Sequence, residues 1–505
     1  MGRRFKVQRA LRRLAPGDVT AVAAGLALPL AFAPWGYWPL ALLSPALLFL
    51  SWRGAPPRRA LGRGFLYGFA AFLTGTWWTF VSVHEFGNAP ATLAFFLTVG
   101  LAAAMGGYYG LLGWVAARWL PAGGALRWLV ALPAAWTAIE WFRGWFLSGF
   151  PWLSLGYSQT DAVLGAYAPL GGVYGLGWLC ALGAGALVAV LVEGRVVRAL
   201  AVATLLVMFA GTGFAERARW TEPAGEPIHA VMVQAAIGQD EKWLEIALEP
   251  TRELYLELTR PHWGADLVIW PEAAIPALLH HEMDFIEALD AEARAAGSEI
   301  LLGILEQDLA SGHYHNVLVS LGGEPEIYRK RQLVPFGEYF PVPAFVRSWM
   351  RLMNLPYTDF APGRADPPPM TLAGIEVAPT ICYEDAFGAQ QRVFFPAAEL
   401  LVNVSNDAWF GDTQAPHQHL QIARMRAMET RRWMLRATNN GVTAVIDPHG
   451  RITQRSRQFV PEVLSAEVTP MRGMTPWLRT GDGPLAGLAI GLVLLVALRR
   501  NRAGR

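Results

Sequence analysis

The chain has 505 residues, of which 53% are hydrophobic and only 16% are charged, and its formal net charge is +2. Soluble domains usually carry about 25% charged residues, so this composition excludes a protein that is soluble over its whole length. The basic residues gather beside apolar runs, where anionic lipid attracts them, so the small positive charge does not indicate a nucleic-acid partner.

Long uncharged runs fill the first part of the chain. A helix needs about 20 apolar residues to cross the hydrocarbon core of a bilayer. We therefore expect a multi-span α-helical membrane domain over residues 1–220, with about seven spans. The first run leads directly into further spans, so we do not expect it to be a cleaved signal peptide. The expected spans are residues 19–34, 38–52, 64–83, 90–117, 128–146, 168–192 and 196–214.

A water-soluble composition follows over residues 221–478, and the chain returns to the membrane over residues 479–505 with an eighth span and a basic tail. Arginine and lysine mark the loops that stay in the cytoplasm. They gather at the N-terminus, in three loops (residues 53–63, 118–127 and 195–198) and in the C-terminal tail. With both ends inside, we expect the domain of residues 221–478 to lie outside the cytoplasm.

Short β-branched runs alternate with helix-length polar stretches in this domain, which favours an α/β layered fold. Gly322 and Gly323 predict a hairpin turn. The predicted strands are residues 229–234, 266–271, 299–305, 316–321, 377–382, 400–406 and 443–446, and the predicted helices are residues 240–259, 283–296 and 414–430.

Three chemically useful residues each lie at the end of a strand-like run: Glu272, Lys330 and Cys382. A carboxylate, an ammonium group and a thiol suggest a cysteine nucleophile with its own base and oxyanion partner. Each residue taken singly also has an ordinary structural interpretation. Cys382 could be a small buried hydrophobe, Glu272 could cap a helix, and Lys330 could belong to a solvated basic edge.

Two further groups of residues are open to similar alternatives. Glu338 follows Gly337 and could be a plain turn residue. The histidines show no zinc-binding spacing, so we expect no metal; they are His313, His315, His417 and His419.

The motifs around these residues, taken together, resemble the nitrilase superfamily of C–N hydrolases. Their placement between membrane spans resembles the membrane-embedded apolipoprotein N-acyltransferase family. The resemblance implies a nitrilase-like αββα sandwich with a Glu272–Lys330–Cys382 triad. The motifs that carry it are Trp270–Glu272, Tyr328–Lys330, Leu333–Glu338, Ile381–Glu384, Ser405–Gly411, Arg436–Gly441, Gly149–Leu153 and Gly156–Gln159.

The resemblance implies that a fatty acyl chain passes from a phospholipid to the α-amino group of an N-terminal diacylglyceryl-cysteine. In bacterial lipoprotein maturation this is the final step. It implies a ping-pong thioester mechanism, with Cys382 as nucleophile, Glu272 as base and Lys330 as oxyanion partner. The expected partners are the phospholipid donor, the apolipoprotein acceptor and the membrane, with no cofactor. The implied location is the bacterial inner membrane, with the catalytic domain on the periplasmic side.

Other residues match supporting positions of the family: Glu338, Glu384, Tyr383, Asn316 and Trp243. We expect Glu338 to hold Lys330 or to share proton handling with Glu272. The apolar segment after Glu338 fits a membrane-contacting lid, although ordinary helix packing is an alternative. The lid residues would be Phe340, Phe345, Trp349 and Met353.

Two rival functions use the same sequence features. A membrane-tethered amidase of the nitrilase type would share the triad and hydrolyse a C–N bond with water. A transporter or receptor with a ligand-binding outer domain is disfavoured, because charged residues inside the spans are nearly absent. Replacing Cys382 with serine separates an enzyme from a binding protein.

Overall fold

The computed structural model describes residues 15–339 and 360–503. The expected lid residues Phe340, Phe345, Trp349 and Met353 lie outside the described residues. Two compact units make up the chain. One unit contains Met1–Ala218 and Thr480–Arg505, and the other contains Arg219–Arg479.

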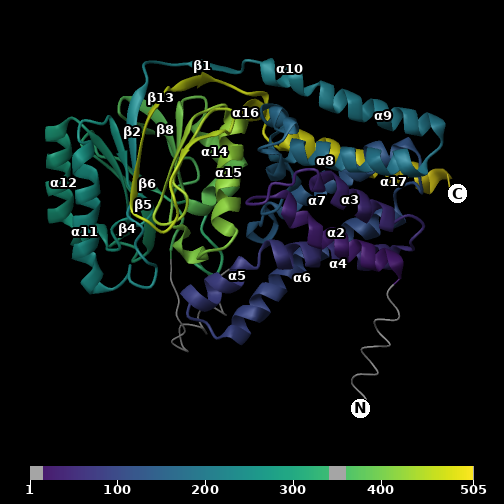
Figure 1. The fold of residues 1–505 in the computed structure, drawn as a ribbon, viewed down its shortest axis with the longest axis horizontal. Helices are drawn as coiled ribbons and strands as arrows, with labels where there is room; N and C mark the ends of the chain where they lie inside the picture. Colours follow the sequence, from purple (N-terminus) through teal and green to yellow (C-terminus); the bar gives the residue numbers. More distant parts are fainter. Residues whose placement is uncertain (1–14, 340–359, 504–505) are drawn as a thin grey trace, which may run out of the picture. The chain divides into compact units, whose positions relative to one another are not determined.

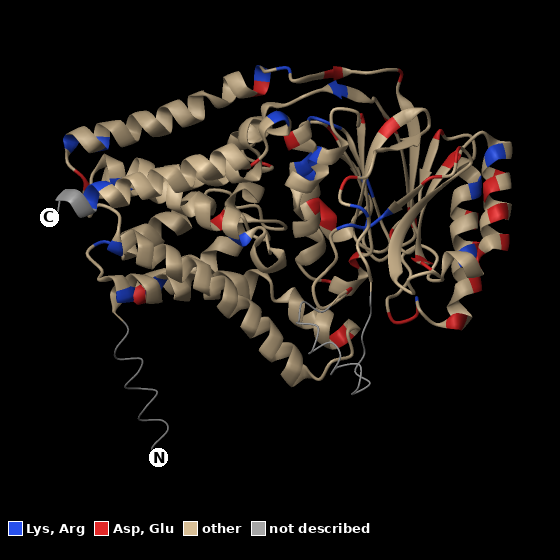
Figure 2. Ribbon diagram, turned by 180° about the vertical axis from the view of Figure 1, so that it is seen from behind, with Lys and Arg blue, Asp and Glu red and all other residues tan. Residues whose placement is uncertain are grey.

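The first unit is helical. Four of its described helices are long and apolar enough to cross a membrane: Ala91–Arg118, Val163–Val192, Arg195–Arg217 and Gly483–Arg500. The count of eight spans stays a prediction. Charged residues are sparse along these helices and collect near their ends (Figure 2). The helices are α2 (Pro16–Ala27), η1 (Leu28–Ala31), α3 (Leu40–Ser51), α4 (Pro57–Gly75), α5 (Trp78–Val81), η2 (Ser82–Phe86), α6 (Ala91–Arg118), η3 (Leu126–Ala131), α7 (Leu132–Arg143), η4 (Phe146–Ser148), η5 (Leu155–Gln159), η6 (Val163–Tyr167), α8 (Ala168–Val192), α9 (Arg195–Ala210), α10 (Thr212–Arg217) and α17 (Gly483–Ala503).

Glycines allow α4 and α6 to pack backbone against backbone. A Cβ atom on Gly64 would lie 2.0 Å from the carbonyl oxygen of Tyr109, and one on Gly113 would lie 2.3 Å from that of Ala60. Helices inside a bilayer gain little from the hydrophobic effect, so close packing through small residues is a main source of their association.

Two charged residues of α7 hold the loop that carries the Gly149–Leu153 motif. Arg143 donates hydrogen bonds to the carbonyl oxygen of Trp152 at 2.7 Å and to Ser154 at 3.0 Å. Glu140 accepts one from the main-chain N–H of Leu155 at 3.0 Å. These contacts satisfy backbone groups that would otherwise be unpaired away from water.

The second unit contains two six-stranded sheets, in the orders β12-β11-β10-β9-β8-β7 and β13-β2-β3-β4-β5-β6. A small third sheet pairs β1 with β14. The strands are β1 (Thr221–Pro223), β2 (Ile228–Gln234), β3 (Leu267–Ile269), β4 (Glu299–Gln307), β5 (Tyr314–Leu321), β6 (Ile327–Arg329), β7 (Met370–Leu372), β8 (Ile375–Ile381), β9 (Leu400–Ser405), β10 (Met434–Thr438), β11 (Ala444–Ile446), β12 (Ile452–Arg455), β13 (Glu462–Val468) and β14 (Met471–Gly473).

Helices cover the outer faces of the two large sheets (Figure 1). Side chains of both sheets, such as Met232 and Leu401, share one core, and Ala423 of α15 belongs to the same cluster. A second core places Tyr255 of α11 and Leu289 of α12 against the other face of the β2-containing sheet. This is the αββα layering that the resemblance implied. The helical segments are α11 (Glu245–Thr259), η7 (Arg260–His262), η8 (Leu279–His281), α12 (Met283–Ala296), η9 (Cys382–Ala386), α14 (Gly388–Gln391), η10 (Arg392–Phe394), η11 (Asp407–Phe410), α15 (Ala415–Thr430) and α16 (Pro476–Thr480).

Parallel pairing brings strand ends of the second unit to common edges. Strand β9 pairs in parallel with both β8 and β10, and β3 pairs in parallel with β2 and β4. The loops after β8 and β9 therefore leave from the carboxyl ends of neighbouring strands in one sheet, and the loop after β3 leaves from the carboxyl end of a strand in the other sheet. These loops carry Cys382, Asn406 and Glu272 respectively.

Candidate active site

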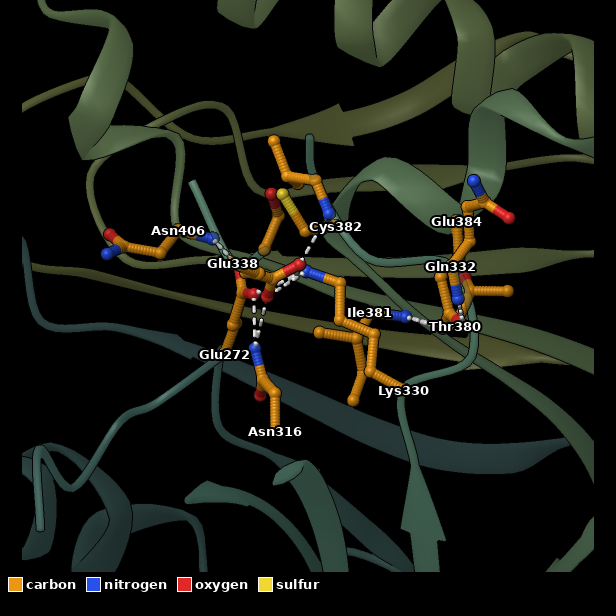
Figure 3. Close-up of polar contacts among 12 residues, drawn as sticks. Glu272, Asn316, Lys330, Gln332, Glu338, Thr380, Ile381, Cys382, Glu384 and Asn406 are labelled. Atoms are coloured by element: carbon orange, nitrogen blue, oxygen red, sulfur yellow. Dashed lines mark hydrogen bonds and ion pairs between the residues drawn. The ribbon is translucent and has the colours of Figure 1, made fainter. Parts of the chain in front are cut away.

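The carboxylate of Glu272 is held from three directions. It follows β3 and Pro271, and its residue is 7% exposed. One oxygen, Oε1, accepts hydrogen bonds from Asn316 Nδ2 at 2.7 Å and from Lys330 Nζ at 3.2 Å. The other oxygen, Oε2, accepts one from the main-chain N–H of Asn406 at 2.8 Å. The carboxylate is thus fixed between two layers of the sandwich (Figure 3).

The ammonium group of Lys330 lies between two carboxylates. Its Nζ is 3.2 Å from Glu272 Oε1 and 2.8 Å from Glu338 Oε1, and the side chain is 1% exposed. The second oxygen of Glu338 accepts a hydrogen bond from the main-chain N–H of Val334 at 2.7 Å. Glu338 therefore contacts Lys330 directly, and the turn at residues 334–338 holds Glu338.

The charges of this group stabilise one another. Burial raises the pKa of the Glu272 carboxyl, but the charge of Lys330 and the hydrogen bonds from Asn406 and Asn316 outweigh burial, so the pKa is lowered. Burial lowers the pKa of Lys330, but Glu272 and Glu338 raise it well above its ordinary value. At neutral pH, Glu272 is therefore an ionised carboxylate beside a fixed positive charge.

Cys382 follows β8 directly and lies beside these residues (Figure 3). Its residue is partly exposed. Burial raises the pKa of the thiol well above its ordinary value, and the charge of Glu272 adds to this effect more than Lys330 offsets it. The resting thiol is thus protonated, next to a carboxylate that can accept its proton.

Glu384 supports the site through the backbone. It is 2% exposed and accepts hydrogen bonds from the main-chain N–H groups of Arg331 and Ile381, both at 2.7 Å. The hydroxyl of Tyr328 donates to the same carboxylate at 2.9 and 3.0 Å. Glu384 therefore ties the segment that carries Lys330 to the strand that precedes Cys382.

The remaining expected residues differ in their placement. Asn316 Nδ2 donates to Glu272 Oε1, as described above, and it also donates to Glu338 Oε1 at 3.4 Å. Tyr383 is buried beside Cys382 in the chain, and its ring packs edge-on against Phe387 at 5.0 Å. Trp243 is 46% exposed, and its indole takes no part in the hydrogen-bonded cluster of the described residues.

Sequence reasoning missed Lys242, which precedes Trp243. Its side chain reaches the site, where Nζ donates a hydrogen bond to the main-chain oxygen of Glu272 at 3.3 Å. The residue is 1% exposed, and burial lowers the pKa of its ammonium group to about 8. No periodic pattern marks this position, because Lys242 lies in a turn before α11.

The chemistry available to this arrangement is acyl transfer through a thiol. A buried ion pair holds the base in its ionised form, and the thiol can lose its proton to that base as it attacks a carbonyl carbon. Within residues 15–339 and 360–503, no three histidine, cysteine or carboxylate side chains form a group that could hold a metal ion.

Comparisons with known proteins give the class of this fold and site. Residues 230–474 match the family described as Carbon-nitrogen hydrolase. The second unit is therefore a nitrilase-like domain of the C–N hydrolase class. A solved CN-hydrolase superfamily protein from Xanthomonas campestris is 18% identical, with a TM-score of 0.37 over 53% of this chain and 98% of that chain.

The first unit and the full-length relatives identify the family. Residues 24–186 match the family described as Apolipoprotein N-acyltransferase N-terminal domain. The apolipoprotein N-acyltransferase of Azotobacter vinelandii is 46% identical, over 97% of this chain and 96% of that protein. That of Methylococcus capsulatus is 42% identical, over 95% of this chain and 96% of that protein. The chain belongs to the apolipoprotein N-acyltransferase family and is an N-acyltransferase.

Proposed function

We propose that this enzyme transfers a fatty acyl chain from a phospholipid to the free α-amino group of an N-terminal diacylglyceryl-cysteine. The observation that carries the chemistry is the contact of Lys330 with Glu272 and Glu338 beside the Cys382 thiol. The lipid substrates come from membership of the family, because the same three groups could also serve hydrolysis.

In the first half-reaction, Glu272 takes the proton of the Cys382 thiol while the sulfur attacks the ester carbonyl of the phospholipid. Lys330 stabilises the negative charge on the carbonyl oxygen, together with a backbone N–H group near Cys382. The bond between the acyl carbon and the glycerol oxygen breaks, and Glu272 gives its proton to that oxygen. A thioester and a lysophospholipid result.

In the second half-reaction, the amine of the apolipoprotein attacks the thioester carbonyl. Glu272 accepts a proton from the amine nitrogen, and the carbon–sulfur bond breaks. The proton returns to the sulfur, so the thiol and the carboxylate regain their resting states. The product is an amide, and the two substrates react in turn.

We place the second unit on the periplasmic side of a bacterial inner membrane. Support comes from the basic residues of loops 53–63, 118–127 and 195–198 and of both termini, which are typical of cytoplasmic segments. Both substrates carry lipid chains, so this location gives the site access to them at the outer surface of the bilayer.

The test uses the full chain in detergent with a phospholipid whose fatty chains carry an isotope label. A synthetic diacylglyceryl-cysteine peptide serves as acceptor, and the same peptide with an acetylated amine is the control. Mass spectrometry should find labelled amide on the free peptide alone. Labelled free fatty acid without labelled peptide would instead support the amidase-like alternative, in which water is the second nucleophile.

A further inference from the structure

Next to Cys382 lies a group of four buried charged side chains that take no part in the proposed chemistry. We call Asp385, Asp407, His419 and Arg436 the buried charge cluster; each is at most 1% exposed. Arg436 lies within β10 and donates to Asp407 Oδ2 at 2.9 Å and to Asp385 Oδ2 at 3.3 Å. Burying ions is costly, so a cluster placed next to a nucleophile calls for a functional explanation.

The histidine of the cluster contacts both aspartates and the nucleophile. His419 Nδ1 is 2.9 Å from Asp407 Oδ1, and Nε2 is 3.0 Å from Asp385 Oδ1. The same Nε2 is 3.2 Å from the main-chain oxygen of Cys382. Asn403 Nδ2 donates to that oxygen at 3.4 Å.

A serine connects the cluster to the other end of Cys382. Ser405 is fully buried at the end of β9, and its hydroxyl donates to Asp407 Oδ1 at 2.8 Å. Strands β8 and β9 pair Ile381 with Val404, so Cys382 and Ser405 are the next residues of two neighbouring strands. Burial raises the pKa of the Cys382 thiol, and the Ser405 side chain opposes that rise. Ser405 and His419 meet on the same oxygen of Asp407.

We propose that His419 and Ser405 are positioning residues for Cys382: His419 holds its carbonyl, Ser405 lies beside its thiol, and their shared contact with Asp407 fixes the two relative to each other. This inference rests on the proposed role of Cys382 as nucleophile. The backbone of Cys382 needs such a hold, because its φ angle of 53° lies in the left-handed region that a residue with a Cβ atom disfavours.

The charges around His419 fit a donor role for both ring nitrogens. Asp385, Asp407 and Arg436 face the ring from η9, η11 and β10 respectively. Burial lowers the pKa of His419, but the two aspartates outweigh burial and Arg436, and they raise it to about 9. With both nitrogens protonated, Nδ1 donates to Asp407, and Nε2 donates to Asp385 and to the Cys382 carbonyl.

The Ser405 hydroxyl can interact with the sulfur of Cys382 in both of its protonation states. With the thiol protonated, Ser405 donates to Asp407 and can accept the S–H hydrogen. When the sulfur becomes a thiolate, the hydroxyl can turn and donate to it instead. A hydrogen bond to the charged form favours that form, so Ser405 lowers the barrier to forming the thiolate and to its departure from the thioester.

Two histidine variants separate a positioning role from a purely structural one. The amide nitrogen of glutamine can take the place of Nε2, whereas that of asparagine can take the place of Nδ1. His419→Gln can keep the bond to the Cys382 carbonyl, and His419→Asn cannot. We expect acyl-Cys382 to form from phospholipid about tenfold faster in His419→Gln than in His419→Asn. Equal losses in the two variants, at matched thermal stability, would reject the role of His419.

A Ser405 variant tests the thiol end of Cys382, and it remains informative if both histidine variants fail to fold. We expect Ser405→Ala to slow alkylation of Cys382 by iodoacetamide about tenfold, because the thiolate loses a hydrogen bond. Ser405→Thr should restore the rate. The matched control is Ser456→Ala, because Ser456 is also buried, at 5% exposed, but its hydroxyl donates to Gln234 Oε1 at 2.8 Å.

Alkylation is followed on the Cys382 peptide by mass spectrometry, which separates it from Cys180, the other cysteine of the chain. Alkylation at the same rate in Ser405→Ala and Ser456→Ala would overturn the proposed role of Ser405. This readout does not involve acyl transfer. If the transfer assay fails but Ser405→Ala is still alkylated more slowly than Ser456→Ala, the result counts against the proposed function and leaves the positioning role standing.

Discussion

The ammonium group of Lys330 keeps the buried carboxylate of Glu272 ionised. Its distances to Glu272 and Glu338 are 3.2 and 2.8 Å. Without it, Glu272 would lose its main charge partner, and burial would favour the protonated form of its carboxyl group. Lys330 thus has two functions in the proposed mechanism, since it keeps Glu272 basic and stabilises the oxyanion.

Replacing this lysine gives the first prediction. We expect Lys330→Met to reduce the rate of acyl-Cys382 formation at least about 100-fold, because the oxyanion loses its main charge partner. The rate is measured by mass spectrometry of the Cys382 peptide. Arg329→Met is the control. Arg329 precedes Lys330 in the chain, but its side chain is 42% exposed and pairs with Glu306. Full acylation in Lys330→Met would contradict the assigned role.

The pH dependence of stability provides the second prediction. The pKa of Glu272 is lowered from 4.5, so its ionised form stabilises the fold above pH 4.5, and this contribution is lost as the pH falls through the lower folded value. We expect Glu272→Gln to be less stable than the wild type near neutral pH and equally stable in strong acid. Thermal unfolding followed by tryptophan fluorescence measures the difference in stability between Glu272→Gln and the wild type. A difference that grew as the pH fell would contradict the prediction.

Sequence reasoning found the residues whose position at a strand end is itself a signal. Glu272, Lys330 and Cys382 each lie at the end of a strand-like run, and the motifs around them are specific. Lys242 gave no such signal, because it lies in an irregular turn. Ser405 opens one of the quoted motifs, but the role of its hydroxyl depends on its contact with Asp407, two residues further on, and on His419, which lies in α15.

At the scale of elements, strand β4 sets the position of the loop that carries Glu272. A Cβ atom on Gly303 would lie 2.2 Å from the carbonyl oxygen of Pro271 and 2.9 Å from Cα of Glu272. The backbone of β4 therefore approaches this loop more closely than any side chain would allow, and it fixes the loop against the sheet.

The third prediction concerns this contact. We expect Gly303→Ala to displace Glu272 and to reduce acyl-Cys382 formation by about 10²-fold, because small displacements of a catalytic group are costly. Gly225→Ala is the control, since a Cβ atom there would meet nothing within 4 Å. Unchanged acylation in Gly303→Ala would show that the loop can move without loss.

The strands and helices were predicted well where their pattern is local. The hairpin expected at Gly322 and Gly323 is confirmed, because β5 and β6 pair antiparallel around it. Strand β10 was missed, because buried Arg436 in its centre makes an interior strand look polar. Helix α11 begins at Glu245 and not at residue 240, because the segment before it forms the turn that carries Lys242. Sheet order depends on pairings between distant segments, which local patterns do not contain.

At the scale of the whole molecule, the proposed function requires a site outside the cytoplasm and helices inside the bilayer. Composition predicted both parts, because uncharged runs and basic loops are visible without a structure. The number of spans is harder to predict, since α2 and α3 have 12 residues each and fall short of the length that spans a bilayer alone.

Labelling of single cysteines tests the orientation and is the fourth prediction. We expect a membrane-impermeant maleimide to label Gly225→Cys in cells whose inner membrane is intact, because residue 225 is exposed in the second unit. Gly194→Cys lies in the loop before α9, beside Arg195, and should be labelled only after lysis. Labelling in the reverse pattern would place the candidate site in the cytoplasm.

The thioester on Cys382 is the most direct test of the central claim. The full chain is mixed with phospholipid, and the Cys382 peptide is weighed before and after adding the diacylglyceryl-cysteine peptide. We predict a fatty-acyl mass on Cys382 that hydroxylamine removes and that moves to the peptide amine at the same rate as it leaves the sulfur. Amide formation with no acyl group ever present on Cys382 would contradict the account.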